Sequence, residues 1–392
     1  MINQTCLDLG ANRSVIRELF EYGRARAQVV GQENIFDFSL GNPSIPAPPE
    51  IREAVLEELD TTEPLKLHGY TSAAGDPEFR RAVAEDLNRR FGADASPEDI
   101  FVTCGAAPGL TAILRALAVP GREVLAMAPF FPEYRPFAQA AGLGFRVVPP
   151  EIPSFRINFS ALESMLTADT AAIILNSPNN PSGVVYPEET LRHLAELLTE
   201  KSRLFGHPIY LISDEPYREL VYDGVSVPWI PHIYPNTIVC YSWSKSLSLP
   251  GERIGYVYVP RSADQSRELF TAIAGAARIS GHVCAPSIWQ RVVGRCIALG
   301  PDLASYDENR RALYHGLIDA GYQVAPPQGA FYLFVQAPGG DAAAFSEKAK
   351  EKDLLIVPGD SFGCPGWFRL CYCVSYDTIQ RSLPLFRELM ER

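Results

Sequence analysis

Short apolar runs rich in β-branched residues alternate along the middle of the chain with longer segments of helical periodicity. The strand-like runs are 100–105, 123–129, 171–178, 209–216, 237–244 and 253–260, and helical patterns occupy 107–119 and 189–205 between them. Nearly continuous apolar strands that alternate with helices are typical of a sheet buried on both faces. We therefore predict an α/β fold whose large domain has a mostly parallel central sheet covered by helices on both faces.

The two ends of the chain carry a different pattern. Residues 13–30 read as one helix before the proline-rich segment GNPSIPAPP, and the C-terminal third combines a helix with the strand-like runs GAFYLFVQ and FRLCYCVS. This mixture predicts a smaller α+β domain formed by both chain ends. We assign residues 45–285 to the large domain, and residues 1–44 and 286–392 to the small one.

Composition and charge exclude several classes of function. The net charge of -11 argues against a nucleic-acid partner, because phosphate binding needs basic patches. No apolar run reaches the roughly 18 residues of a membrane span, and the N-terminus lacks the basic start and apolar core of a signal peptide. The eight cysteines show neither the paired spacing of a zinc site nor the density of a disulfide framework. We therefore expect reduced thiols, no metal site and a cytoplasmic protein.

Polar residues gather where three of the predicted strands end. Asn176 follows one apolar run, Asp214 ends the next, Tyr217 comes three residues later, and the segment SWSK (242–245) ends the run after that. Taken singly, Asp214 is explained as a helix cap and NNPSG as a turn. Because ligands bind at the carboxyl ends of the strands in open α/β sheets, the three strand ends together favour one functional site.

Lys245 is the most informative residue of this group. A free lysine has a pKa of about 10.4 and is mostly protonated at neutral pH. To attack a carbonyl it must be neutral, which requires desolvation or a nearby positive charge such as that of Arg253. The reaction that suits such a lysine best is a Schiff base with pyridoxal 5'-phosphate, whose ring nitrogen works in its protonated form. Asp214 is the candidate to hold that proton.

The phosphate of such a cofactor needs hydroxyls, an arginine and main-chain amides. Ser242, Arg253 and the turn Gly105-Ala106-Ala107, which opens a predicted helix, are the candidates for these contacts.

The segment SWSKSLSLPGERIGY resembles the S-x-S-K-x-x-x-x-x-G-x-R-x-G-Y pattern of the class I/II aminotransferases, which are fold-type I enzymes that use pyridoxal phosphate. The segments NNPSG and SDEPYREL match two further signatures of that family, in the expected order and spacing. The resemblance covers nearly the whole chain. It implies an aminotransferase that moves the amino group of an L-amino acid to a 2-oxo acid through a ping-pong cycle of pyridoxal and pyridoxamine phosphate.

The resemblance also implies catalytic roles at matching positions. Lys245 would carry the cofactor and later move a proton, Asp214 would pair with the pyridinium nitrogen, and Tyr217 would donate its hydroxyl to the phenolic oxygen. The other implied cofactor contacts are Tyr70, Gly105, Ala106, Ala107, Phe131, Asn180, Ser242, Ser244 and Arg253, with the ring of Phe131 stacked on the cofactor.

For substrate binding, the resemblance implies Gly41, Asn180 and Arg369. Arg369 would hold the substrate α-carboxylate, for which a bidentate arginine is better suited than a lysine. Tyr70 matches a tyrosine that reaches the phosphate of the neighbouring subunit. The implied assembly is a homodimer with its active sites at the interface.

Two departures from the family pattern affect what can be predicted. The phosphate turn is Gly-Ala-Ala, whereas many relatives have a hydroxyl or a lysine there, so binding would depend on main-chain amides and Arg253. In ARISGHVCAPSIW, Ser280 falls at the position of the arginine of dicarboxylate-specific relatives, and Arg278 lies two residues early. An acidic, an aromatic and a small aliphatic substrate side chain therefore all remain open.

Two other classes of function compete with transamination. The same scaffold supports a pyridoxal phosphate-dependent β-lyase acting on carbon-sulfur bonds, an amino-acid oxidase or a synthase, because fold and cofactor do not decide the reaction. A non-catalytic binding protein is the third hypothesis. The intact Lys245 and the lack of a DNA-binding extension argue against it.

Overall fold

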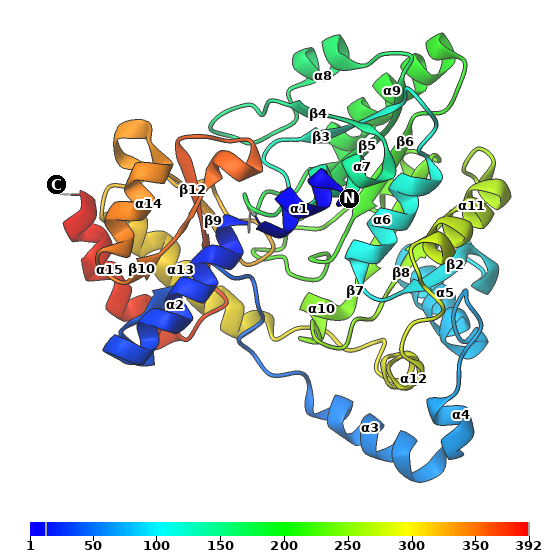
Figure 1. The fold of residues 1–392 in the computed structure, drawn as a ribbon, viewed down its shortest axis with the longest axis horizontal. Helices are drawn as coiled ribbons and strands as arrows, with labels where there is room; N and C mark the ends of the chain where they lie inside the picture. Colours follow the sequence, from blue (N-terminus) through cyan, green and yellow to red (C-terminus); the bar gives the residue numbers. More distant parts are fainter. Residues whose placement is uncertain (12–13, 391–392) are drawn as a thin grey trace.

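The computed structural model of the chain describes residues 1–11 and 14–390 (Figure 1). A seven-stranded sheet forms its centre, with the strand order β2-β8-β7-β6-β5-β3-β4. Strand β8 runs antiparallel to its neighbours β2 and β7, and the other neighbouring pairs are parallel. The predicted mostly parallel sheet is therefore confirmed. The strands are β2 (Ile100–Thr103), β3 (Glu123–Met127), β4 (Gly144–Val148), β5 (Thr170–Asn176), β6 (Tyr210–Asp214), β7 (Thr237–Ser242) and β8 (Gly255–Tyr258).

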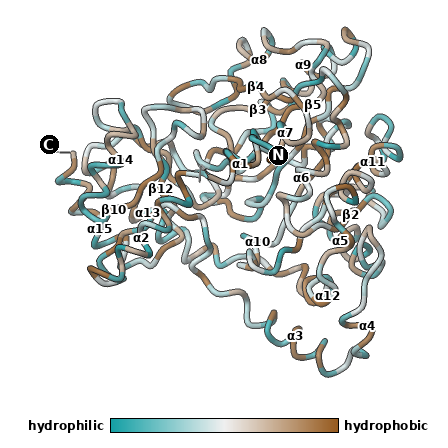
Figure 2. The backbone as a smooth tube through the Cα atoms, viewed as in Figure 1, coloured by the Kyte–Doolittle hydropathy of each residue, from teal (hydrophilic) through white to brown (hydrophobic). Residues whose placement is uncertain are grey.

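Helices cover both faces of this sheet because alternate residues of each strand point to opposite sides. In β7, Ile238 and Cys240 belong to one hydrophobic cluster with helices α6 (Ala106–Ala116) and α11 (Ser266–Ile279). Val239 and Tyr241 belong to another cluster, with α3 (Pro49–Thr61), α5 (Pro77–Phe91) and α12 (Ser287–Arg295). Figure 2 shows hydrophobic stretches in the inner strands and more hydrophilic stretches on outer helices and loops. The expected two-sided burial is confirmed.

The smaller unit combines elements from both ends of the chain. Strands β9 (Tyr332–Gln336), β11 (Val357–Pro358) and β12 (Trp367–Cys371) form an antiparallel sheet in the order β11-β12-β9. Strand β1 (Phe36–Asp37) pairs in parallel with β10 (Leu354–Leu355). Figure 1 shows α2 (Val15–Val30), in blue, on the same side of the molecule as α14 (Ala342–Lys350) and α15 (Tyr376–Met390) near the C-terminus. This confirms an α+β unit built from both ends.

The domain limits at 45 and 285 stay a prediction. Helix α12, which begins two residues after the second limit, packs on α3 and α5 through Val292 and Val293. The remaining helices are α1 (Gln4–Ala11), α4 (Pro64–His68), α7 (Tyr134–Ala141), α8 (Phe159–Met165), α9 (Glu188–Phe205), α10 (Trp243–Ser246) and α13 (Leu303–Asp319). Short 3-10 turns cover Gln32–Asn34, Pro97–Asp99, Ile230–His232, Pro338–Gly340 and Gly359–Phe362.

Most predicted elements exist but end earlier than their apolar runs. The run 171–178, for example, becomes a strand that stops at Asn176, because Pro178 follows and has no backbone N–H for a ladder. The predicted helix 13–30 is α2, and its first predicted residue, Arg13, lies outside the described residues. Among residues 1–11 and 14–390, no helix is long and apolar enough to cross a membrane.

Candidate active site

Three parallel strands bring polar residues to one edge of the large sheet. Asn176 at the end of β5 lies opposite Asp214 at the end of β6, and Asp214 in turn lies opposite Cys240 of β7, two residues before Ser242. The Nδ2 atom of Asn176 donates to the main-chain oxygen of Asp214 at 2.8 Å, and its Oδ1 accepts from the main-chain nitrogen of Asn180 at 2.7 Å. The predicted convergence of strand ends is therefore observed.

Asp214 is a buried carboxyl group with one oxygen left without a partner. The residue is 4% exposed, and the hydroxyl of Tyr134 donates to its Oδ2 at 2.5 Å. Oδ1 has no hydrogen-bond partner among the described residues. Burial raises the pKa of Asp214 to about 7, against the opposing effect of the Tyr134 hydrogen bond. An enclosed, unpaired carboxyl oxygen of this kind fits a ligand that presents a protonated ring nitrogen.

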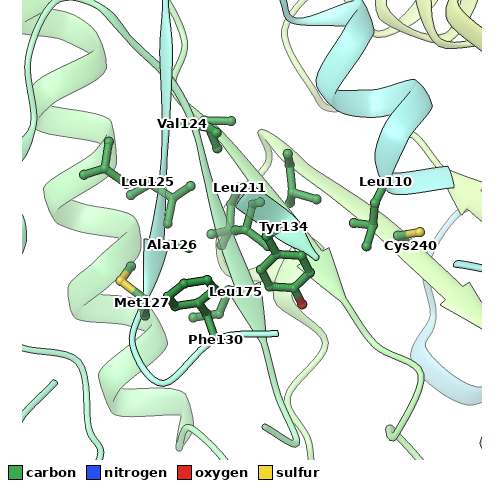
Figure 3. Packing of buried hydrophobic residues seen from close by; sticks show 14 of the residues in the cluster. Leu110, Val124, Leu125, Ala126, Met127, Phe130, Tyr134, Leu175, Leu211 and Cys240 are labelled. Atoms are coloured by element: carbon green, nitrogen blue, oxygen red, sulfur yellow. The ribbon is translucent and has the colours of Figure 1, made fainter. Parts of the chain in front are cut away.

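The Tyr134 hydroxyl reaches Asp214 from an otherwise apolar cluster. Figure 3 shows the ring among Leu125, Leu175, Leu211 and other hydrophobic side chains of the sheet. Burial, together with the nearby Asp214 charge, raises the pKa of Tyr134 well above its usual value. The hydroxyl therefore stays protonated and acts as a hydrogen-bond donor to Asp214.

Lys245 lies in the short helix α10, directly beyond the end of β7. Its Nζ donates to the main-chain oxygen of Gly41 at 2.5 Å and lies 5.5 Å from the centre of the Phe331 ring. Loss of solvation on burial lowers the pKa of Lys245, and the charges of Arg369 and Arg253 act in the same direction against two nearby thiols. The site therefore favours the neutral amine that a nucleophilic lysine requires.

Arg369, at the centre of β12, is a buried guanidinium group whose hydrogen-bond partners are neutral. It is 2% exposed, its Nη1 donates to Oδ1 of Asn180 at 3.1 Å, and its Nη2 donates to the main-chain oxygen of Ser39. Its Nε has no hydrogen-bond partner among the described residues, and its charge acts on the nearby carboxyl group of Asp37. The side chain is held over the ring of Tyr332, with 4.7 Å from Cζ to the ring centre. A buried, rigid guanidinium with neutral partners is suited to receive a carboxylate.

Tyr217 and Gly41 are both fixed through Tyr332. The hydroxyls of Tyr217 and Tyr332 lie 2.9 Å apart. A Cβ on Gly41 would lie 2.0 Å from the Tyr332 hydroxyl oxygen, so only glycine leaves room for that ring. Glycine is therefore required at the position whose main-chain oxygen accepts from Lys245.

The predicted phosphate turn opens helix α6. Ala106 and Ala107 are its first two residues, so their main-chain N–H groups have no partner within the helix. Gly105 has a φ of +88°, and a Cβ there would lie 2.4 Å from Nη2 of Arg253. Amides at a helix start beside an arginine form an environment suited to an anion.

The serines on the Lys245 side of the turn are both buried. Ser242 is the N-cap residue of α10, and Ser244 lies within that helix. Their contacts to a cofactor phosphate stay predictions, as does the contact from Arg253, whose Nη1 donates to the main-chain oxygen of Pro250 at 2.9 Å.

Two other predicted residues stand apart from this group. Tyr70 is 89% exposed, so it is free to contact a second subunit. Phe131 is half-buried, and its ring lies edge-on to Tyr134 with 5.6 Å between centres. The roles of Tyr70 and Phe131 stay predictions. Arg278, which is not among the predicted site residues, lies exposed in the last turn of α11. The structure also shows no group of three His, Cys, Asp or Glu residues placed to hold a metal ion in the described part of the chain.

Sequence reasoning missed several residues that shape the site. Tyr134, Tyr332 and Ser39 contact Asp214, Tyr217 and Arg369 respectively. The only signal for Tyr134 in the sequence is its place in FFPEY, three residues after Phe131. Tyr332 lies in the strand-like run GAFYLFVQ and reads there as an ordinary core residue.

Comparisons with known proteins identify the family of this chain. A family model described as aminotransferase class I and II matches residues 33–383. An aspartate aminotransferase of Thermotoga maritima is 29% identical over 374 residues, which cover 94% of this chain and 94% of that protein. A probable aspartate/prephenate aminotransferase of Thermus aquaticus is 31% identical over 363 residues, which cover 90% of each.

Solved structures give the same result at the level of the fold. An amino transferase from Eubacterium rectale matches with a TM-score of 0.97 and 49% identity, over 100% of this chain and 98% of that one. The aspartate aminotransferase of Thermotoga maritima matches with a TM-score of 0.88 and 27% identity, over 100% of both chains.

Proposed function

Because this chain belongs to the class I and II aminotransferase family, we propose that it moves the amino group of an L-amino acid to a 2-oxo acid at the site around Lys245. The chain is an aminotransferase, and members of its family use pyridoxal 5'-phosphate. We propose the same cofactor here, which would alternate between its pyridoxal and pyridoxamine forms in two half-reactions.

The observation that carries the cofactor proposal is the unpaired Oδ1 of Asp214. A buried carboxyl oxygen without a partner costs free energy unless a ligand supplies a donor. A protonated ring nitrogen supplies both the donor and the positive charge that favours an ionised Asp214 with a pKa near 7. Tyr134 holds the other oxygen, so the carboxylate is oriented before the ligand arrives.

The remaining cofactor contacts are proposed from the predicted residues. The phosphate would lie at the start of α6, against Gly105, Ala106 and Ala107, with Ser242, Ser244 and Arg253 around it. Tyr217 and Asn180 would donate to the phenolic oxygen, and Phe131 would stack on the ring. These assignments are supported by the burial of Asn180, Tyr217, Ser242 and Ser244 and by the free amides of the helix start.

The reaction would then need three contributions, one from the cofactor and two from the protein's own side chains. The cofactor supplies an electron sink for the substrate α-carbon. Arg369 would bind the substrate α-carboxylate and orient the α-carbon, because its guanidinium is already held in place by Asn180 and Tyr332. Burial favours Nζ of Lys245 as a neutral amine. This amine would take the proton from the substrate α-carbon and then deliver it to the cofactor.

The proposed substrate class is defined by the groups that all amino acids share. Relatives of this chain carry names that refer to aspartate, to aspartate and prephenate, and to aromatic amino acids. Arg369 recognises the α-carboxylate that these substrates have in common. The β-lyase, oxidase and synthase alternatives are not favoured, because the similar proteins are named aminotransferases.

We further propose a homodimer with active sites at its interface, acting in the cytoplasm. The dimer proposal is supported by the exposed ring of Tyr70, which contacts little of its own subunit. The cytoplasmic proposal is supported by the eight cysteines, all of which are free thiols.

A half-reaction experiment tests the proposed function. The purified protein is loaded with pyridoxal phosphate and mixed with a panel of amino acids, and its visible spectrum is followed without an acceptor. The proposal expects some amino acids to convert the cofactor to the pyridoxamine form, and a 2-oxo acid to reverse this. Release of pyruvate and ammonia from cystathionine, with no pyridoxamine form from any amino acid, contradicts it and supports the lyase.

A further inference from the structure

A network of hydrogen bonds begins at Ser246, next to Lys245, and runs from the buried Tyr241 outward to the half-buried Glu219 and the exposed Arg90. The hydroxyls of Ser246 and Tyr241 lie 2.9 Å apart, and the Tyr241 hydroxyl donates to Oε2 of Glu219 at 2.9 Å. Nη2 of Arg90 donates to Oε1 of the same carboxylate at 2.7 Å. This hydrogen-bond network thus links α10, β7, the segment after β6 and the last turn of α5.

Each hydrogen bond in this network has a defined donor. A tyrosine hydroxyl has one proton, and the Tyr241 proton points to the Glu219 carboxylate, so the Ser246 hydroxyl must donate to Tyr241. Burial and the nearby charge of Glu219 raise the pKa of Tyr241 well above its usual value. The hydroxyl therefore stays protonated over the working pH range, and the donors in the network do not change.

The same turn of α5 also packs against the segment that starts at Asp214. Arg218 forms a buried ion pair with Glu215, the residue after Asp214. Its guanidinium lies 5.0 Å from the ring centre of Phe91 and 5.1 Å from that of Trp229. Arg90 and Phe91 are neighbours in sequence, so one helix end holds both the Asp214 segment and, through Tyr241, the Lys245 turn.

We propose that Tyr241, anchored by Glu219 and Arg90, is a positioning residue that fixes the Lys245 amine through Ser246. Helix α10 has only four residues, so its own hydrogen bonds do not hold it firmly. Its two ends are held instead by Trp243, which packs on Tyr241 and Tyr256, and by the Ser246 hydrogen bond. The hydrogen bond between Ser246 and Tyr241 keeps the Lys245 amine in its desolvated position against Gly41 and Phe331. The proposal rests on the assignment of Lys245 as the reactive lysine under the proposed function.

The test measures the reactivity of Lys245 in the protein without cofactor. An amine-reactive acylating reagent is applied at a series of pH values, and the labelling of the Lys245 peptide is followed by mass spectrometry. In Tyr241→Phe, the released turn is expected to label at least threefold faster at high pH. The pH midpoint of labelling is expected to rise, because a more solvated amine holds its proton longer.

Matched variants separate this role from general packing. Tyr258→Phe is the control, because Tyr258 is buried in the same cluster and its hydroxyl donates to the main-chain oxygen of Ala93, away from Ser246. It is expected to leave Lys245 labelling unchanged. Ser246→Ala is expected to reproduce the Tyr241→Phe result, and the double variant is expected to add nothing further.

Two outcomes overturn the proposal. If Ser246→Ala and Tyr241→Phe both leave the rate and the pH midpoint of labelling at wild-type values, Tyr241 does not position Lys245. If Tyr258→Phe changes labelling as much as Tyr241→Phe, the effect is one of core packing. Because the readout needs no cofactor, a protein that never binds pyridoxal phosphate would defeat the proposed function and still give a result here.

Discussion

Tyr134 and Asp214, which lie 80 residues apart in sequence, share a buried hydrogen bond from the phenol hydroxyl to Oδ2 at 2.5 Å. The bond leaves Oδ1 as the one carboxyl oxygen available to a ligand. It also lowers the pKa of Asp214 against the larger effect of burial. One tyrosine therefore both orients the carboxylate and favours its ionised form.

Removing the Tyr134 hydroxyl tests this relationship. In Tyr134→Phe the pKa of Asp214 is expected to rise above about 7, so less of the carboxylate is ionised at neutral pH. We expect kcat/KM to fall roughly tenfold at pH 7, which corresponds to a hydrogen-bond contribution of about 1.4 kcal/mol. The loss is expected to shrink as the pH rises. The pH profile of kcat/KM from pH 6 to 9 measures both effects.

Tyr234→Phe is the matched control for this variant. Tyr234 is buried in the same cluster, and its hydroxyl donates to the main-chain oxygen of Ile209 at 2.6 Å, away from Asp214. The control is expected to keep the wild-type pH profile. An identical profile in wild type and Tyr134→Phe would refute the role given to the tyrosine.

The raised pKa of Asp214 also predicts how the cofactor-free protein responds to pH. Between the unfolded pKa near 3.8 and the folded pKa of about 7, the native state keeps a proton that the unfolded state releases. The free energy of unfolding therefore falls as the pH rises through this range, by up to about 4 kcal/mol from this group.

Asp214→Asn removes that titration. The apo variant is expected to be more stable than the apo wild type at pH 8, with a smaller difference at pH 4, in urea unfolding experiments. With cofactor present, the same variant is expected to lose at least 100-fold in activity, because the ring nitrogen loses its anionic partner. Equal pH dependence of unfolding in the two apo proteins would show that Asp214 titrates normally.

Arg369→Lys tests the proposed carboxylate site. Lysine keeps the charge but loses the planar fork, so we expect kcat/KM for amino acids to fall roughly 100-fold, mainly through KM. Cofactor binding is expected to stay near the wild-type value. Arg310→Lys is the control, because Arg310 is another buried arginine, paired with Asp307 and Asp223 outside the site. A larger effect on cofactor affinity than on KM would contradict this assignment.

Gly41→Ala tests the close packing beside Lys245. The new Cβ would lie 2.0 Å from the Tyr332 hydroxyl oxygen, so the ring must shift and release Tyr217. We expect a loss of stability of about 1 to 3 kcal/mol and a larger loss of activity than stability alone explains. Gly275→Ala, in α11 with open space around it, is expected to leave activity unchanged and to raise stability slightly, because alanine favours a helix interior more than glycine does. Wild-type kinetics in Gly41→Ala would show that Tyr332 does not depend on this glycine.

The main features of the sheet could be predicted because they are local. Each strand-like run is followed directly in sequence by the polar residues that end it. Asp214 after IYLIS and Lys245 in SWSK are examples. The predicted strands were too long where Pro or Ser continued an apolar run, because hydrophobicity does not mark the last ladder hydrogen bond. The antiparallel course of β8 between β2 and β7 was not predicted, since strand direction depends on connections through space.

The residues that the sequence did not identify act over long separations. Ser39 and Arg369 are 330 positions apart, and Tyr217 and Tyr332 are 115 apart. Ser39 and Tyr332, the members of these pairs that were not predicted, read locally as an ordinary loop residue and an ordinary core residue. Only the folded chain shows that they orient the groups predicted to bind cofactor and substrate.

The central claim is that Lys245 carries the cofactor. The most direct measurement is borohydride reduction of the protein loaded with pyridoxal phosphate, followed by digestion and mass mapping of the modified peptide. The account predicts that the reduced cofactor is attached to Lys245, and that Lys245→Ala acquires no label at any specific site. Stable attachment to a different lysine, or no attachment in the wild-type protein, would contradict it.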